Sequence, residues 1–318
     1  MTYPYYSPAA PLTAPVVLPA SSHKPNPTQY LPDAGLVDAI NVALLLGQPL
    51  LVTGEAGTGK TQLAYHLAHY LGLPEPLKFE TKSNSTAKDL FYFYDHLRHF
   101  QAAQTQKGSL NSRDYLTFNA FGTAILRANA YENIQDLVND DFVKHDQPTR
   151  SVVLIDEIDK AQRDFPNDIL NEIEGMYFRI PELSNVKVQA DLRPVLVLTS
   201  NSEKHLPAAF LRRCVYYHLP FPDGDRLKQI IASRVADLAI GTAFIDSALS
   251  IFQTLRSSNL HKSPATAELL NWIITLKTRY PDVANPLENK KAAIVSSLSA
   301  LIKNEEDRKT VLNMIDRL

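Results

Sequence analysis

The fold of this chain is decided by residues 50–61, which read LLVTGEAGTGKT. Residues 54–61 match the pattern G-x-x-x-x-G-K-[ST], and residues 50–53 before them have the composition of the buried strand that this pattern follows. Glycines let a backbone wrap closely around a phosphate with its N–H groups pointing inward. A helix that begins here directs the positive end of its dipole at the same anion. The stretch therefore predicts a phosphate loop. The alternative interpretation is a glycine-rich turn that matches the pattern by chance.

The ligand predicted for this phosphate loop is a nucleoside triphosphate. Lys60 adds a positive charge for the phosphates, and the hydroxyl of Thr61 is suited to bind Mg²⁺. The residues expected to hold the nucleotide are Gly54, Glu55, Ala56, Gly57, Thr58, Gly59, Lys60 and Thr61.

Composition sets the size and setting of the protein. A chain of 318 residues with 45% hydrophobic residues can hold one large domain and a smaller one. Its formal charge of −2 gives no global attraction to nucleic acid or to an anionic membrane. The single cysteine, Cys214, excludes an internal disulfide and favours a reducing compartment. With no signal-peptide pattern and no long uncharged apolar stretch, we expect a cytoplasmic protein without membrane insertion.

Three regions are expected along the chain. Residues 1–29 belong to a stretch rich in proline and tyrosine without apolar periodicity, which predicts a disordered arm; a proline-rich docking peptide is the alternative. Residues 30–220 are expected to form a nucleotide-binding α/β domain. Its strands are predicted at residues 50–53, 77–80, 151–156, 194–200 and 215–219, with helices between them, an alternation that is typical of a parallel sheet covered on both faces. Residues 221–318 are expected to form a small helical lid.

A second motif lies in residues 152–159, which read VVLIDEID. Four apolar residues predict a strand buried on both faces, and the carboxylates follow at its carboxyl end, where open parallel sheets bind ligands. Asp156 is expected to hold Mg²⁺, and Glu157 to orient and activate the attacking water. The alternative is an ordinary solvated acidic turn after a strand.

Two further polar positions follow. Residues 195–201 read VLVLTSN, and Asn201 can reach the water or the γ-phosphate if this strand lies beside the strand of the phosphate loop. An ordinary turn asparagine is the alternative. Residues 210–214 read FLRRC and place an arginine just before the last strand, where it can face a neighbouring subunit.

The order of these motifs resembles that of the AAA+ ATPases, and within them the MoxR-like branch. The resemblance runs from residue 30 almost to the C-terminus, and it implies ATP as the nucleotide with Mg²⁺. It also implies a sensor role for Asn201 and an arginine finger at Arg213, with Arg212 as the competing choice. Such a finger acts in trans, so a ring of identical subunits, usually six, is the expected active species. An intramolecular salt bridge is the alternative for both arginines.

The C-terminal third shows helical periodicity. Apolar residues at helical spacing predict the buried faces of three successive helices. These faces consist of Leu227, Ile230, Ile231, Val235 and Leu238 in the first helix, of Phe244, Ala248, Leu249, Phe252 and Leu255 in the second, and of Leu269, Leu270, Ile273 and Leu276 in the third. Many relatives carry a second sensor, an arginine, at the start of a lid helix. The corresponding residues 261–268 contain none, so either Lys262 takes this role or the role is missing. Ser263 and Pro264 suit the N-cap and first position of the helix.

Residues 82–150 are the hardest to interpret. Aromatic residues at 91–94 are expected in the core, with a partner-facing surface as the alternative. His96 and His99 are expected on a packed or surface helix, because no third metal ligand lies near them in the sequence. In MoxR-like proteins this region usually carries insertions that line or flank the pore of the ring.

The resemblance also implies a use for the hydrolysis. MoxR-like ATPases typically remodel or activate a client protein, often with a partner that carries a von Willebrand factor A domain. One alternative is a nucleic-acid motor of the McrB type, which the near-neutral charge disfavours. Another is a nucleotide-gated scaffold with little turnover, which the missing second arginine would permit.

Overall fold

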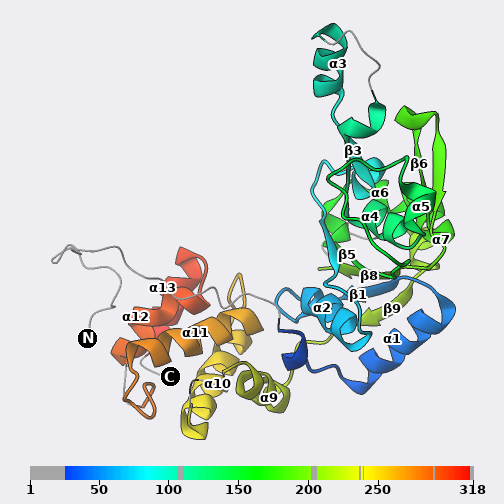
Figure 1. Ribbon diagram of the computed structural model, residues 1–318. Coiled ribbons are helices and arrows are strands. Elements are labelled where there is room, and N and C mark those ends of the chain that lie inside the picture. The colour runs from blue at the N-terminus through cyan, green and yellow to red at the C-terminus, as the bar shows by residue number, and fades with distance from the viewer. Residues whose placement is uncertain are drawn as a thin grey trace. The chain divides into compact units, whose positions relative to one another are not determined.

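The structure, a computed structural model, describes residues 26–105, 111–201, 206–235, 238, 240–288 and 291–315. These residues divide into two compact units (Figure 1). The first consists of residues 26–55 and 59–220, and the second of residues 221–318 together with residues 56–58. The two units are described in turn.

The first unit is built on a five-stranded sheet in the order β2-β5-β8-β1-β9, and every neighbouring pair is parallel. The strands are β1 (Leu50–Thr53), β2 (Leu77–Glu80), β5 (Val152–Asp156), β8 (Val195–Ser200) and β9 (Val215–His218). All five predicted strands are confirmed, with their ends within one residue of the expected positions. Strand β8 pairs with β1, which is the condition under which Asn201 was expected to reach the phosphates.

Alternate residues of the central strands face two separate apolar cores, because side chains along a strand point to opposite faces. One face carries Leu50 and Val52 against α1 (Ala34–Leu46) and α2 (Lys60–Tyr70). The other face carries Leu51 and Leu198 against α4 (Ala120–Arg127) and α7 (Leu170–Gly175). The α/β fold with helices on both faces of a parallel sheet is therefore confirmed.

Residues 26–29 are folded, although the sequence places them in the expected disordered arm. A short 3-10 helix, η1 (Pro27–Gln29), is capped by the side chain of Asn26 and packs on α2. The imidazole Nδ1 of His66, on α2, lies 2.9 Å from the carbonyl oxygen of Pro27. The expected disordered arm therefore does not extend to residue 29, and its remainder, residues 1–25, lies outside the described residues.

Two insertions are added to the sheet. The first follows β2 and contains an antiparallel hairpin, β3 (Tyr92–Tyr94) with β4 (Leu116–Phe118). The helix α3 (His96–Thr105) of this insertion projects away from the sheet (Figure 1). The second hairpin, β6 (Tyr177–Ile180) with β7 (Val186–Gln189), precedes β8. Shorter elements complete this unit: η2 (Ala87–Leu90), α3 (His96–Thr105), η3 (Ser112–Tyr115), α5 (Tyr131–Ile134), η4 (Ile158–Lys160), α6 (Phe165–Asp168), η5 (Pro181–Leu183) and α8 (Ala208–Leu211).

Aromatic residues of the first insertion form core, as expected. Phe91, Tyr92 and Tyr94 are buried, and the ring of Phe91 stacks on that of Phe178 at the start of the second hairpin. In the described part of this insertion, two phenylalanine residues are exposed. Phe93 is 56% exposed, because successive side chains of a strand alternate, and Phe100, on α3, is 61% exposed.

The second unit is helical, as its periodicity predicts. It contains α9 (Gly224–Arg234), α10 (Thr242–Ser257), α11 (Thr266–Arg279), α12 (Lys291–Leu301) and α13 (Glu305–Met314). The fully buried Trp272 lies in its core and donates its indole N–H to the hydroxyl of Ser297 at 2.8 Å. Within the described part of the chain, no helix has the length and apolarity needed to cross a membrane.

The start of α11 corrects one prediction. The helix begins at Thr266 with Ala265 as N-cap, two residues after the predicted Ser263 cap. The N–H of Ala265 donates to Oε2 of Glu268 at 3.2 Å. The preceding segment is held outside the helix because its amides at His261 and Lys262 donate to the carboxylate of Asp307, on α13.

Candidate nucleotide-binding and hydrolysis site

The phosphate loop, residues 54–61, connects the end of β1 to the start of α2. Gly59 is the N-cap of α2 with φ +97°, a conformation that glycine adopts at no steric cost. Among the described residues, no side chain caps this helix end. Because the first N–H groups of a helix have no partner within the helix, this terminus is suited to bind an anion.

Lys60 is the first residue of α2 and is buried. Its ammonium donates to the carbonyl oxygens of Gly54 and Glu55, each at 2.8 Å. Burial lowers the pKa of Lys60. Four nearby carboxylates act in the opposite direction and raise it; in decreasing order of effect they are Asp159, Asp156, Glu157 and Glu55. The loop and the acidic segment, residues 156–159, are therefore close enough to interact electrostatically.

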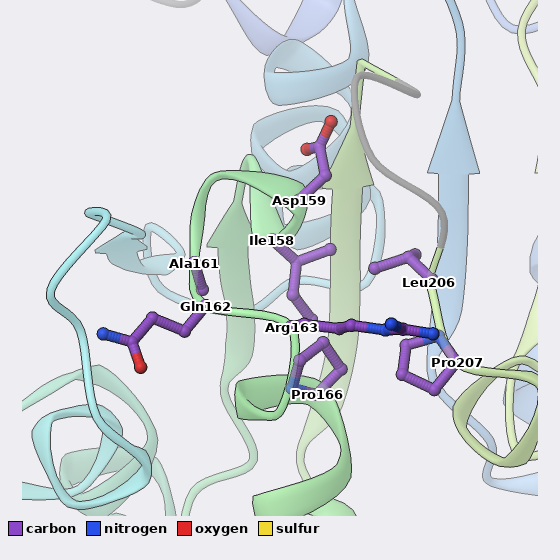
Figure 2. Close-up of a pocket in the computed structure, with 8 residues that line it drawn as sticks. All are labelled: Ile158, Asp159, Ala161, Gln162, Arg163, Pro166, Leu206 and Pro207. Atoms are coloured by element: carbon purple, nitrogen blue, oxygen red, sulfur yellow. The ribbon is translucent and has the colours of Figure 1, made fainter.

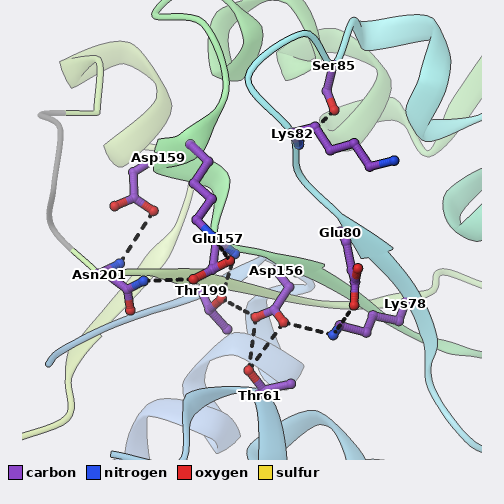
Figure 3. A network of polar contacts seen from close by, with 11 residues as sticks. Thr61, Lys78, Glu80, Lys82, Ser85, Asp156, Glu157, Asp159, Thr199 and Asn201 are labelled. Carbon is purple, nitrogen blue, oxygen red and sulfur yellow. Dashed lines mark hydrogen bonds and ion pairs between the residues drawn. The ribbon is translucent and has the colours of Figure 1, made fainter. Parts of the chain in front are cut away.

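Thr61 and Asp156 meet directly, although 95 residues separate them in the sequence. The Thr61 hydroxyl donates to Oδ1 of Asp156 at 3.0 Å and lies 3.3 Å from Oδ2 (Figure 3). Thr199, on β8, also donates to Oδ1, at 2.6 Å. A hydroxyl beside a carboxylate is an oxygen donor set of the kind that Mg²⁺ binds, with the remaining ligands supplied by water and phosphate. The residues present therefore fit a magnesium ion.

Glu157 stands where β5 ends, in the left-handed conformation with φ +56°. Its N–H donates to the hydroxyl of Thr199 at 2.8 Å. The side-chain amide of Asn201 donates to Oε1 of Glu157 at 2.9 Å (Figure 3). The ammonium of Lys160 lies 2.5 Å from Oε2. A non-glycine residue in this conformation costs of order 1–3 kcal/mol, and such strained residues cluster at active sites and ligand-binding sites. The structure thus brings Asn201 and Glu157 together.

Three residues of this site were not assigned roles from the sequence. Thr199 is fully buried and bridges Asp156 to the backbone of Glu157. Asp159 is buried and is the carboxylate that most raises the pKa of Lys60. Lys78, on β2, lies 3.1 Å from Oδ2 of Asp156. Thr199 and Asp159 lie inside the two sequence motifs at residues 195–201 and 152–159, so these motifs could have identified both residues. Lys78 is recognisable only once β2 is known to pair with β5.

Arg213 does not contact the phosphate loop of its own chain. Its Nε donates to Oε2 of Glu174 at 3.1 Å, and its Nη1 donates to the carbonyl oxygen of Ala209 at 3.1 Å. Both charged side chains of this salt bridge are exposed, at 41% and 64%. Arg212 is the C-cap of α8 and is exposed. Lys262 belongs to the helical unit, where its N–H donates to Asp307 at 3.0 Å.

A cavity of about 440 Å³ lies next to the acidic segment (Figure 2). It is lined by residues 158, 159, 161–163, 166, 206 and 207. Its lining is mostly apolar, and Asp159 and Arg163 are its charged members. Phosphates are therefore not expected in this cavity. Among the described residues, no group of three histidine, cysteine, aspartate or glutamate side chains is arranged to hold a metal ion.

Comparisons with known proteins identify the family of the chain. No curated protein matched the sequence. Among solved structures, a point mutant of RuvB from Thermotoga maritima is similar at 17% identity and a TM-score of 0.49, covering 89% of this chain and 75% of that one. The RuvB Holliday junction branch migration motor of the same organism is similar at 16% identity and a TM-score of 0.46, covering 89% and 74%. The family model for the ATPase family associated with various cellular activities (AAA) matches residues 50–221, which is more than half of the chain. The chain therefore belongs to the AAA ATPase family and is an ATPase.

Proposed function

We propose that this protein is a MoxR-like AAA+ ATPase that couples Mg²⁺-dependent ATP hydrolysis, in a ring of its own copies, to the remodelling or activation of a client protein. The observation that carries the chemistry is the hydrogen bond of 3.0 Å between Thr61 and Asp156, which joins the phosphate loop to the acidic segment. In this proposal residues 30–220 are the nucleotide-binding domain, residues 221–318 are the lid, and the protein acts in the cytoplasm.

Each residue of the site has a role in this proposal. The amides of residues 54–61 and the ammonium of Lys60 bind the phosphates. Thr61 and Asp156 hold Mg²⁺, which when bound neutralises phosphate charge. Glu157 accepts a proton from the attacking water, and Asn201 orients the Glu157 carboxylate through the hydrogen bond at 2.9 Å. Lys262 is the candidate for the second sensor, as a point charge without the bidentate geometry of arginine.

The MoxR-like assignment is supported by the places of the two insertions. One follows β2 and contains the hairpin β3–β4, and the other is the hairpin β6–β7 just before β8. Both lie between the phosphate loop and Asn201, and the first falls within residues 82–150, where MoxR-like proteins usually carry insertions.

The proposed ring is supported by the surroundings of Arg213. A finger that acts in trans must be exposed and must not be used by its own nucleotide site. The guanidinium of Arg213 is exposed, and its partners among the described residues are the exposed Glu174 and a backbone carbonyl. Exposed salt bridges contribute about 0–1 kcal/mol, so exchange of Glu174 for a neighbour's phosphate costs little.

Mixed rings test the action in trans. Arg213→Ala protein is expected to bind nucleotide but to lose most of its hydrolysis, because a finger contributes about 10³- to 10⁵-fold in rate. Mixed with Glu157→Gln protein, it should regain activity, since its intact Glu157 then receives Arg213 from the neighbour. Arg212→Ala is the matched control and should keep most of the activity. An Arg213→Ala protein that no mixture rescues would contradict a finger in trans.

The client is tested by capture on a stalled ring. Glu157→Gln protein should bind ATP without hydrolysing it and so hold its partner longest. Affinity capture with ATP, compared with capture without nucleotide, is expected to enrich a protein client, and a partner with a von Willebrand factor A domain is the first candidate to look for. Hydrolysis that rises on adding DNA in a salt-dependent way would instead indicate a nucleic-acid motor. Binding of ATP without turnover in the assembled ring would indicate a scaffold.

A further inference from the structure

Lys78 occupies an unusual position for a strand lysine. It lies on β2, the edge strand next to β5, and Glu80 of β2 pairs in register with Asp156. Its ammonium lies 3.1 Å from Oδ2 of Asp156 and 2.7 Å from Oε1 of Glu80 (Figure 3). One cation is therefore shared between a carboxylate of the site and a carboxylate outside it.

The two carboxylates differ in their surroundings. The Asp156 side chain is 11% exposed, whereas that of Glu80 is 71% exposed. On Asp156, two hydroxyls already donate to Oδ1, from Thr61 and Thr199. Lys78 supplies the cation on Oδ2. A carboxylate this deeply buried is costly to leave without a compensating charge, whereas Glu80 is solvated with or without a partner.

We propose that Lys78 is an internal counter-ion of Asp156 that competes with Mg²⁺. In the metal-free protein it neutralises the buried carboxylate. When Mg²⁺ binds, two cations on one carboxylate repel each other, and Lys78 transfers its ion pair to Glu80, which is already within 2.7 Å. Lys78 and Glu80 thereby set the Mg²⁺ concentration at which the site fills. This inference rests on the proposed magnesium site at Thr61 and Asp156.

Competition predicts opposite effects for the two partners. Without Lys78, Mg²⁺ no longer displaces a resident cation, so it should bind more tightly. Without the charge of Glu80, Asp156 is the one anionic partner that remains for Lys78 among the residues that the structure describes, so Mg²⁺ should bind more weakly. If Lys78 instead orients Asp156 for the metal, removal of Lys78 should weaken Mg²⁺ binding. A salt bridge that is only structural predicts no change in Mg²⁺ binding.

The experiment measures metal binding without turnover. Binding of the fluorescent, non-hydrolysable analogue mant-AMP-PNP to the full chain is followed while Mg²⁺ is increased, and the half-saturating Mg²⁺ concentration is determined. Lys78→Met is expected to lower this concentration about three- to tenfold, and Glu80→Gln to raise it about threefold, sizes suited to partly screened ion pairs. The melting temperature of the metal-free protein should fall in Lys78→Met. Lys82→Met is the control, since Lys82 extends away from Asp156 (Figure 3), and it should change neither value.

Other results would overturn the inference. An unchanged half-saturating concentration in Lys78→Met, with a lower melting temperature, would leave a structural salt bridge only. A raised concentration would make Lys78 an orienting group. If Lys78→Met does not fold, the exposed Glu80→Gln variant decides alone, and an unchanged or lowered concentration there contradicts the proposal. Analogue binding by the wild-type protein that does not depend on Mg²⁺ would contradict the proposed metal site itself, and this inference with it.

Discussion

At the scale of single residues, Glu157 is held in position through both its backbone and its side chain. Its backbone adopts φ +56°, and both oxygens of its carboxylate are engaged, Oε1 by Asn201 and Oε2 by Lys160. Neither partner lies on β5, which ends at Asp156. A strained backbone supported by contacts from two directions fixes the position of one carboxylate, as catalysis of proton transfer requires.

Cys214 provides a residue-level test of burial in the first unit. Its thiol donates to the carbonyl oxygen of Phe210 at 3.4 Å, and burial raises its pKa to about 12. Because the thiolate is the reactive form, native protein at pH 8 should react with iodoacetamide far more slowly than protein unfolded in urea. As pH rises past the ordinary thiol value of 9.0, the unfolded chain loses this proton first, so the contribution of Cys214 to stability is lost between about pH 9 and pH 12. Equal alkylation rates in the native and unfolded states would contradict the burial.

The site residues differ in how far the sequence predicts them. Thr61, Asp156, Glu157 and Asn201 follow from motifs, because each stands at a fixed offset from an apolar strand, and the structure places them in hydrogen-bonded pairs. Lys78 does not follow from a motif, because its partner lies on another strand and the pairing depends on sheet register. The roles of all these residues remain predictions for the experiments above.

At the scale of elements, helix α4 packs unusually close to the first insertion. A methyl group built on Gly122 would lie 2.0 Å from the carbonyl oxygen of Phe91. The same helix buries Phe121 and Ile125 in the core on that face of the sheet. The absence of a side chain at residue 122 therefore allows α4 to approach the backbone of the insertion.

Gly122→Ala is accordingly expected to destabilise the protein by about 3 kcal/mol, because a backbone atom cannot move aside as a flexible side chain can. Urea denaturation measures the change. Gly241→Ala is the control, since a methyl group there meets nothing within 4 Å, and it should change stability by less than about 1 kcal/mol. Equal effects of the two substitutions would contradict the packing of α4.

A second element-scale prediction concerns Asp33, the N-cap of α1. Its Oδ1 accepts the N–H of Leu36 at 2.9 Å and the hydroxyl of Tyr217, on β9, at 2.6 Å. Asp33→Ala should cost about 1–2 kcal/mol and Tyr217→Phe about 1 kcal/mol in free energy of unfolding. Because the two residues share one bond, the double variant should cost less than the sum. Full additivity in urea denaturation would contradict the shared bond.

Elements with one strong physical signature were predicted well. Strands buried on both faces, such as residues 152–156, are apolar runs that end in polar residues, and the helices of the second unit have clear 3.6-residue periodicity. The insertion at residues 82–150 has neither signature, because its strands are three residues long and its core is aromatic. The start of α11 was misplaced because a long-range partner, Asp307, holds the segment that contains the predicted cap.

At the scale of the whole molecule, the chain joins a nucleotide-binding sheet to a separate helical unit, each with its own core. Membership of the AAA ATPase family shows that the protein is an ATPase. In the proposed ring, Arg213 of one subunit acts at the nucleotide site of its neighbour. The near-neutral charge of −2 agrees with a protein client better than with a nucleic acid. We propose that hydrolysis takes place where the phosphate loop meets the acidic segment.

The most direct measurement of that claim is ATP turnover and ATP affinity of the Glu157→Gln protein. The substitution keeps the shape of the side chain and removes its ability to accept a proton, so affinity for ATP should stay within about threefold of wild type while turnover falls at least about 100-fold. Undiminished turnover in Glu157→Gln protein would contradict the assignment of the acidic segment and the account built on it.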